Sequence, residues 1–129
     1  MLDLVNLSLS YGPVPAVRDL CLSVGEAEAV ALIGANGAGK SSVLKAVLGL
    51  ERSRGGVSLG GVEINHLATP DRVSAGLALS PEGRLVFPDM TVRENLSLGL
   101  IERTKPRAGS LEQEVCALFP RLEERMTQA

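Results

Sequence analysis

The chain has 129 residues, which suffices for about one small domain that buries roughly two thirds of its unfolded surface. Its 13 basic and 15 acidic residues nearly balance, so the sequence excludes the basic excess typical of nucleic-acid-binding proteins and of polybasic membrane patches. Because it also lacks a stretch of ~18 apolar residues, a secretory signal and paired cysteine motifs, we expect a cytoplasmic protein with no nucleic-acid partner.

The first part of the chain predicts three strands. Alternating residues from Leu2 favour a strand that ends at the turn Tyr11-Gly12-Pro13, and residues 17–24 favour a second strand that pairs with it as an antiparallel hairpin. Residues 29–33, Ala-Val-Ala-Leu-Ile, form a continuous apolar run, which is typical of a fully buried strand.

Residues 34–42, Gly-Ala-Asn-Gly-Ala-Gly-Lys-Ser-Ser, fit the P-loop pattern G-x-x-x-x-G-K-[ST]. Glycines allow successive backbone N–H groups to point at a phosphate, and a helix from about Gly39 to Gly49 adds the positive end of its dipole. We expect Lys40 to reach the β- and γ-phosphates and Ser41 to bind a magnesium ion. The predicted nucleotide-binding residues of this loop are Gly34, Asn36, Gly37, Ala38, Gly39, Lys40, Ser41 and Ser42.

The middle of the chain alternates short strands and a helix. Residues 55–64 predict a tight hairpin around Gly60-Gly61. Thr69 and Pro70 predict a helix with Thr69 as its cap, and this helix should end near Gly76. Residues 77–79 then predict a brief buried strand.

The last part of the chain begins with a strand-breaking turn at residues 81–84 and the apolar cluster 85–88, which could be core or contact surface. Thr91 and Glu94 have the spacing of a capping box that opens a helix through Leu100. Residues 105–109 predict a polar linker. The pattern then predicts a helix capped by Ser110, interrupted at Pro120, with Leu111, Val115 and Leu118 on one face.

With these motifs in this order, the chain resembles the ATP-binding subunit of an ABC transporter, and most closely the subgroup that serves branched-chain amino acid importers. The resemblance implies an α/β fold: a P-loop NTPase core with an N-terminal antiparallel β subdomain and the start of a helical subdomain. It also implies an ATP-binding core over residues 1–90 and the start of the helical subdomain over residues 91–129.

The resemblance assigns two further site residues. Tyr11 matches the family's aromatic residue that stacks on adenine, although it could instead only pack at the end of its strand. Glu82, within Pro-Glu-Gly-Arg, occupies the place of a residue that contacts magnesium and the attacking water, where most members have glutamine. With Lys40 it forms the expected catalytic pair, and with Ser41 the expected metal ligands; a solvated turn glutamate is the plainer alternative. Arg84 and Phe87 match positions that face the transmembrane subunit.

The resemblance further implies ATP and Mg²⁺ as cofactors, transmembrane permease subunits as partners, and a second ATP-binding subunit, identical or different, as a dimer partner. The protein would lie at the cytoplasmic face of the inner membrane. The L-S-G-G-Q signature, the Walker B aspartate, the catalytic glutamate and the switch histidine of the family are absent from the sequence. We therefore expect a truncated N-terminal half that is inactive alone, although the complete protein would be a transport ATPase.

Three alternatives remain open at this point. The subunit could serve an importer of urea or of another amide or amino acid. The chain could be a different P-loop enzyme, such as a small-molecule kinase, which however requires neither Tyr11 nor the segment 81–88. It could also be a non-catalytic nucleotide-binding fragment.

Overall fold

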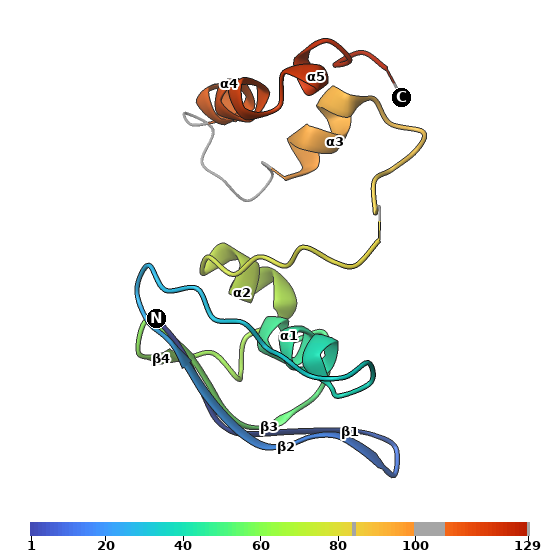
Figure 1. Cartoon of the computed structure of the whole chain (residues 1–129). Coiled ribbons are helices and arrows are strands. Elements are labelled where there is room, and N and C mark those ends of the chain that lie inside the picture. Colours follow the sequence, from blue (N-terminus) through green and yellow to red (C-terminus); the bar gives the residue numbers. More distant parts are fainter. Residues whose placement is uncertain (84, 100–107, 129) are drawn as a thin grey trace. The chain divides into compact units, whose positions relative to one another are not determined.

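The computed structural model describes residues 1–83, 85–99 and 108–128 (Figure 1). These residues divide by their contacts into two compact units, Met1–Leu79 and Ser80–Ala129. The functional division that the resemblance places after residue 90 stays a prediction.

The first unit contains an antiparallel sheet of four strands in the order β2-β1-β3-β4. The strands are β1 (Leu2–Tyr11), β2 (Val14–Val24), β3 (Arg54–Leu59) and β4 (Val62–Glu63). Both predicted hairpins are therefore confirmed, with β2 beginning three residues earlier than expected. The two-residue turn between β3 and β4 has positive φ at both Gly60 and Gly61, as a tight hairpin turn requires.

A bulge in β1 sets which side chains face the core. The pairing of β1 with β2 shifts between Leu4 and Leu7, and Asn6 in this interval has φ of 51°. The extra residue places Leu4 and Leu7 on the same face, and both are buried. Across the sheet, Gly55 has φ of 93°, and a Cβ there would overlap the carbonyl oxygens of Val5 and Asn6. The bulge therefore depends on glycine at this position.

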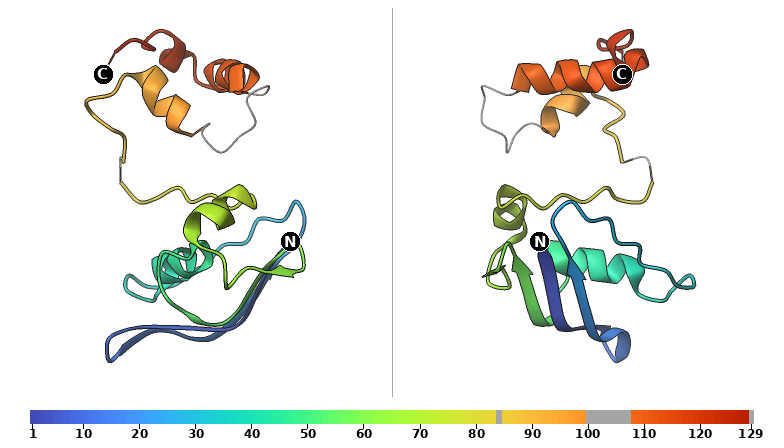
Figure 2. Two further views of the ribbon diagram at one scale, coloured as in Figure 1. Left: turned by 180° about the vertical axis from the view of Figure 1, so that it is seen from behind. Right: turned by 60° about the vertical axis from the view of Figure 1, so that its left-hand side comes forward.

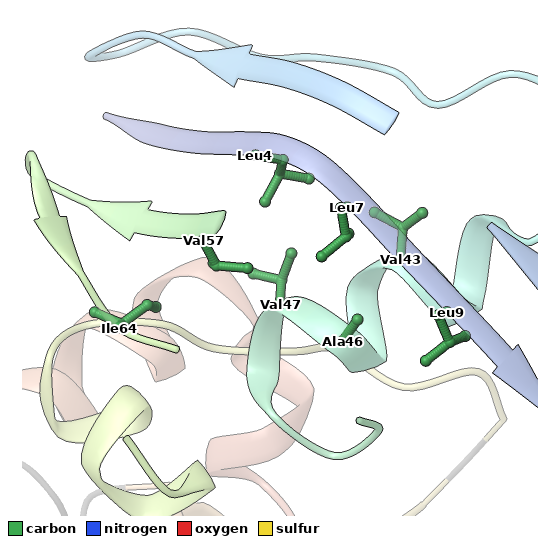
Figure 3. Packing of buried hydrophobic residues seen from close by; sticks show 8 residues of the cluster. All are labelled: Leu4, Leu7, Leu9, Val43, Ala46, Val47, Val57 and Ile64. Carbon is green, nitrogen blue, oxygen red and sulfur yellow. The ribbon is translucent and has the colours of Figure 1, made fainter. Parts of the chain in front are cut away.

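Helix α1 (Lys40–Leu48) packs within the curve of the sheet (Figures 1 and 2). Its residues Val43, Ala46 and Val47 point toward β1 and β3 and are buried there (Figure 3). The core cluster consists of Leu4, Leu7, Leu9, Val43, Ala46, Val47, Val57 and Ile64. The helix ends at Gly49 in the left-handed conformation, so the predicted bounds are confirmed.

The predicted strands at residues 29–33 and 77–79 are not strands in this structure. A strand needs a ladder partner, and neither segment pairs with a strand of the described sheet. Ile33 is 94% exposed, so this apolar run is not buried as expected. Only Leu32 and Leu77 of the two segments pack against the core cluster.

Helix α2 (Thr69–Ser74) begins one residue before the predicted position. Thr69 is its first helical residue and Ala68 is the N-cap, without a side-chain capping hydrogen bond, so the prediction of a Thr69 cap is wrong. Pro70 lies in the first turn as expected, because a proline there lacks only an N–H that the helix does not use.

The second unit contains α3 (Val92–Leu98), α4 (Ala108–Leu118) and α5 (Pro120–Glu123). The capping box of α3 is confirmed: the Glu94 N–H donates to Thr91 Oγ1 (3.2 Å) and the Thr91 N–H donates to Glu94 Oε2 (2.8 Å). The predicted end at Leu100 lies outside the described residues, and α3 ends at Leu98.

Helix α4 differs from its prediction in two respects. It includes Ala108, so Ser110 lies inside the helix and the prediction that Ser110 is its N-cap is wrong. The rest of the predicted linker, residues 105–107, lies outside the described residues. Leu118 is 75% exposed, and among residues 111–118 of this helix Cys116 is the buried one instead. The interruption at Pro120 is confirmed.

Candidate functional site

The P-loop forms a turn that leads into the first turn of α1. The Ala38 N–H donates to the Ala35 carbonyl (3.1 Å), and Gly37 has φ of 83° with open space where a side chain would begin. The first bond of the helical ladder runs from the Val43 N–H to the Gly39 carbonyl (3.0 Å). In general, the N–H groups in the first turn of a helix lie beyond the reach of its i−4 ladder, which is the property that makes a helix N-terminus an anion site.

Gly39 holds this loop against the sheet. Its φ is 88°, and an added Cβ would overlap the carbonyl oxygen of Ala16 in β2, far inside the 3.0 Å that real Cβ atoms respect. The same Cβ would lie 3.3 Å from Cγ2 of Val17. Two independent reasons therefore require glycine at position 39: its left-handed backbone conformation and the close approach of the loop backbone to the backbone of β2.

Lys40 places its ammonium group at the loop. Its Nζ donates to the carbonyl oxygens of Gly34 and Ala35, both at 2.7 Å, and its side chain is half-buried. Asn36, Gly37 and Ala38 lie between these groups in the exposed part of the loop. The loop thus carries a positive charge and helix N–H donors together, a donor set that fits the phosphates of a nucleotide.

Two hydroxyl residues follow Lys40 in the first turn of α1. Ser41 is exposed, as a magnesium ligand would need to be, and Ser42 is half-buried. Tyr11, at the end of β1, lies 44% exposed with its Oη 3.4 Å from Ser42 Oγ. The structure therefore brings the expected base-stacking residue to the phosphate loop, although the two are 31 positions apart in the sequence.

Glu82 belongs to the second unit, whereas Lys40 and Ser41 belong to the first. Its carboxylate is exposed, and its approach to the phosphate site stays a prediction. Arg84 lies outside the described residues. Phe87 is 57% exposed and lies in an apolar segment with Leu85 and Val86, which are 70% and 65% exposed.

This apolar segment lines a groove of about 510 Å³ within the second unit. The lining residues are Leu85, Val86, Phe87, Pro88, Met90, Val92, Asn95, Leu96, Leu98 and Leu122. The sequence prediction missed the residue that shapes it, Asn95. Its amide accepts from the Phe87 N–H (2.9 Å) and donates to the carbonyls of Phe87 (3.0 Å) and Met90 (3.1 Å). Asparagine inside a helix was the available signal, since it is disfavoured there unless it bonds elsewhere.

Arg72 is a second residue that the sequence did not reveal. It is 5% exposed, and its guanidinium donates to four carbonyl oxygens. Nη1 bonds Ala46 (3.1 Å) and Val47 (2.8 Å) in the last turn of α1, while Nε bonds Leu67 (3.0 Å) and Nη2 bonds Asn65 (3.0 Å). Burial lowers the pKa of this guanidinium, and the negative end of the α1 dipole offsets part of the cost.

Two features are absent from the part of the chain that the structure describes. Within residues 1–83, 85–99 and 108–128, no three His, Cys, Asp or Glu side chains gather closely enough to hold a metal ion. No helix in the described part of the chain is long and apolar enough to cross a membrane.

Comparison with known proteins adds independent information. Residues 17–129 match the family model described as ABC transporter. The chain is 38% identical to the high-affinity branched-chain amino acid transport ATP-binding protein BraG of Pseudomonas aeruginosa, covering 99% of this chain and 55% of BraG. It is also 38% identical to the sn-glycerol-3-phosphate import ATP-binding protein UgpC 1 of Rhizobium etli, covering 82% of this chain and 30% of that protein. A third relative, the ribose import ATP-binding protein RbsA of Rhodococcus jostii, is 33% identical.

Solved structures agree in fold. An ATP-binding subunit of an ABC transporter superimposes with a TM-score of 0.84 and 29% identity, covering 98% of this chain and 53% of the other. The dimeric bacterial ABC transporter cassette MJ0796 gives a TM-score of 0.73 at 24% identity. These likenesses confirm the predicted fold class. The chain spans about half the length of BraG and less than a third of UgpC 1.

Proposed function

This chain belongs to the ABC transporter family, and from that premise we propose that it carries the phosphate-binding part of the ATP-binding subunit of an importer. The observation that carries this proposal is the P-loop itself, with Gly39 fixed against β2 and the Lys40 ammonium held at the loop. Relatives named for amino acid, glycerol phosphate and ribose import all support an importer subunit. Family membership also removes the basis for the kinase alternative.

The residues of the loop suit an ATP–Mg²⁺ complex. Lys40 exchanges two carbonyl acceptors for phosphate oxygens, and the N–H groups of the first turn of α1 face the same charge. Ser41 offers its hydroxyl to the magnesium ion, and the Tyr11 ring offers a face to the base. Bound ATP and Mg²⁺ would supply the phosphoanhydride and the charge that polarises it, while the chain contributes positioning.

Replacement of one lysine tests ATP binding. Lys40→Ala removes a charged donor, which is worth about 1.5–3 kcal/mol, so ATP affinity in calorimetry should fall about 10- to 150-fold. Lys45→Ala is the matched control, because Lys45 lies on the same helix, exposed near its other end. Equal ATP affinities of the two variants would contradict the proposal.

Glu82 is a magnesium-side ligand in this proposal. A carboxylate oxygen binds Mg²⁺ as well as an amide oxygen does, but it adds a negative charge. In the complete protein, Glu82→Gln should therefore shift the magnesium dependence and the rate of ATP hydrolysis, whereas Glu63→Gln on β4 should shift neither. If Glu82→Gln left both the magnesium dependence and the rate of ATP hydrolysis unchanged, Glu82 would not be a magnesium-side ligand.

The groove of the second unit is the docking site for a helical segment of the permease. Its exposed apolar side chains, with Phe87 at 57%, offer a surface that an apolar helix face could cover. Phe87→Asp should abolish co-purification of the subunit with its permease. Phe119→Asp is the control, because Phe119 is equally exposed, at 60%, but does not line the groove.

The transported solute is a branched-chain amino acid. The match to BraG over 99% of this chain and the glutamate at position 82 support this choice over urea or another amide. The subunit pairs with a second ATP-binding subunit and lies at the cytoplasmic face of the membrane, in keeping with its membership of the ABC transporter family. Leucine uptake by the assembled transporter tests the solute: uptake of urea in place of leucine would contradict it.

A further inference from the structure

The hydroxyl of Tyr11 has a contact that stacking on a base does not require. Its Oη lies 3.4 Å from Ser42 Oγ, in the first turn of α1. This separation is longer than the 2.7–2.8 Å typical of O–H···O bonds, so the hydrogen bond is weak. A phenylalanine at position 11 would present the same ring face without this bond.

The position of Tyr11 beside the loop is set by more than this one contact. Tyr11 ends β1, and β2 begins three residues later at Val14. The β2 residue Ala16 meets Gly39 so closely that no side chain fits between them. The end of the β1–β2 hairpin is thus fastened to the P-loop through β2, and this holds the Tyr11 hydroxyl near Ser42.

The two hydroxyls form a relay of donors. The Tyr11 O–H donates to Ser42 Oγ, which leaves the hydrogen of the Ser42 hydroxyl available for another acceptor. Accepting a hydrogen bond polarises a hydroxyl, so Ser42 becomes a better donor to a phosphate oxygen. The effect reaches the phosphate end of a ligand and is independent of any base.

We propose that the Tyr11 hydroxyl is a positioning group for phosphate binding, acting through Ser42, in addition to the stacking role of the Tyr11 ring. The inference rests on the proposed function, because it takes the P-loop as a nucleotide-phosphate site. Its distinctive consequence is that a residue assigned to the base also contributes to the affinity for a ligand that has no base.

Inorganic tripolyphosphate is the probe that separates the two roles. In calorimetric titrations of the full chain with magnesium present, Tyr11→Phe should weaken tripolyphosphate binding by about threefold, the low end for one hydrogen bond, and ATP binding by the same factor. In a Ser42→Ala background, Tyr11→Phe should have no further effect on either ligand, because the relay is already broken. The thermal unfolding midpoint of each variant is also measured without ligand. If Tyr11 had a purely structural role, Tyr11→Phe would lower this midpoint by the same amount whether residue 42 is serine or alanine.

The outcomes are distinct. Unchanged tripolyphosphate affinity in Tyr11→Phe overturns the relay and leaves stacking as the only role of Tyr11. A threefold loss that persists in the Ser42→Ala background also overturns it, because the effect then bypasses Ser42. Failure of the unmutated chain to bind either ligand refutes the proposed nucleotide function itself. A threefold loss for both ligands that disappears in the Ser42→Ala background supports the relay.

Discussion

Replacement of Gly39 by alanine tests whether the close approach of the P-loop to β2 is needed for the fold. An alanine at φ of 88° costs about 1–2 kcal/mol, because left-handed conformations are unfavourable for residues with a Cβ. The overlap with the Ala16 carbonyl oxygen adds about 1–3 kcal/mol, the usual range for overpacking. Gly39→Ala should therefore lower the free energy of unfolding by about 2–5 kcal/mol, a large part of the stability of a small domain.

Gly37→Ala provides the matched control. Gly37 has nearly the same φ, 83°, in the same loop, but nothing lies within 4 Å of an added Cβ. Its cost should be the conformational part alone, about 1–2 kcal/mol. Urea unfolding of both variants, followed by circular dichroism, gives the difference directly. Equal free energies of unfolding for the two variants would show that β2 moves away from the added Cβ without loss of stability, and this result would refute the reasoning.

Three further predictions concern other parts of the chain. Arg72→Met removes the Arg72 donors to four carbonyl oxygens, in buried hydrogen bonds to Ala46 and Val47 and part-buried ones to Asn65 and Leu67, and should destabilise the first unit by about 2–4 kcal/mol in urea unfolding. Arg52→Met, at an exposed position, should change this free energy of unfolding little. Hydrogen bonds from the Thr91 backbone and side chain hold the pKa of the Glu94 carboxyl below its ordinary 4.5. The stability that the ionised carboxylate adds to α3 is therefore present above pH 4.5 and is lost as the pH falls through the lowered pKa. An acid titration followed by circular dichroism should show a loss of helix in the unmutated chain that Glu94→Gln does not show. Burial, reinforced by nearby carboxylates, raises the pKa of the Cys116 thiol, so a disulfide reagent should label exposed Cys21 quickly and Cys116 only after unfolding.

The sequence predicted those elements whose causes are local. The β3–β4 hairpin follows from two glycines that both take positive φ, and the start of α3 follows from the Thr91–Glu94 capping box. The bounds of α1 follow from the P-loop pattern and from Gly49. In each case residues a few positions apart determine the backbone, so spacing alone contains the information.

The predictions that failed depend on distant partners. Apolar character at residues 29–33 favours burial, but a strand forms only where another strand supplies hydrogen bonds, and the described sheet supplies none there. The bulge that aligns Leu4 with Leu7 depends on Gly55, about 50 positions away in the chain. Likewise, nothing near Arg72 in the sequence indicates that its acceptors lie at the end of α1.

The candidate site follows the same division. The loop residues and Lys40 were predictable from one motif, and the structure brings Tyr11 to them. The contact of Gly39 with Ala16 was not predictable, because the motif states which residue is needed but not what it touches. Asn95 was missed because its acceptors, at Phe87 and Met90, lie outside its own helix.

The two carbonyl bonds of Lys40 have a consequence for how tightly any anion can bind. The loop is already ordered by its own lysine, at 2.7 Å from Gly34 and from Ala35, so binding need not pay the entropy of organising a flexible segment. In return, every arriving phosphate competes with acceptors that the ammonium already has. The affinity of the loop for an anion is therefore the difference between the hydrogen bonds that Lys40 gains with the anion and those that it gives up with the two carbonyls. An anion that engages Lys40 alone gains little from this exchange. A polyphosphate that engages several donors at once can replace both carbonyl oxygens.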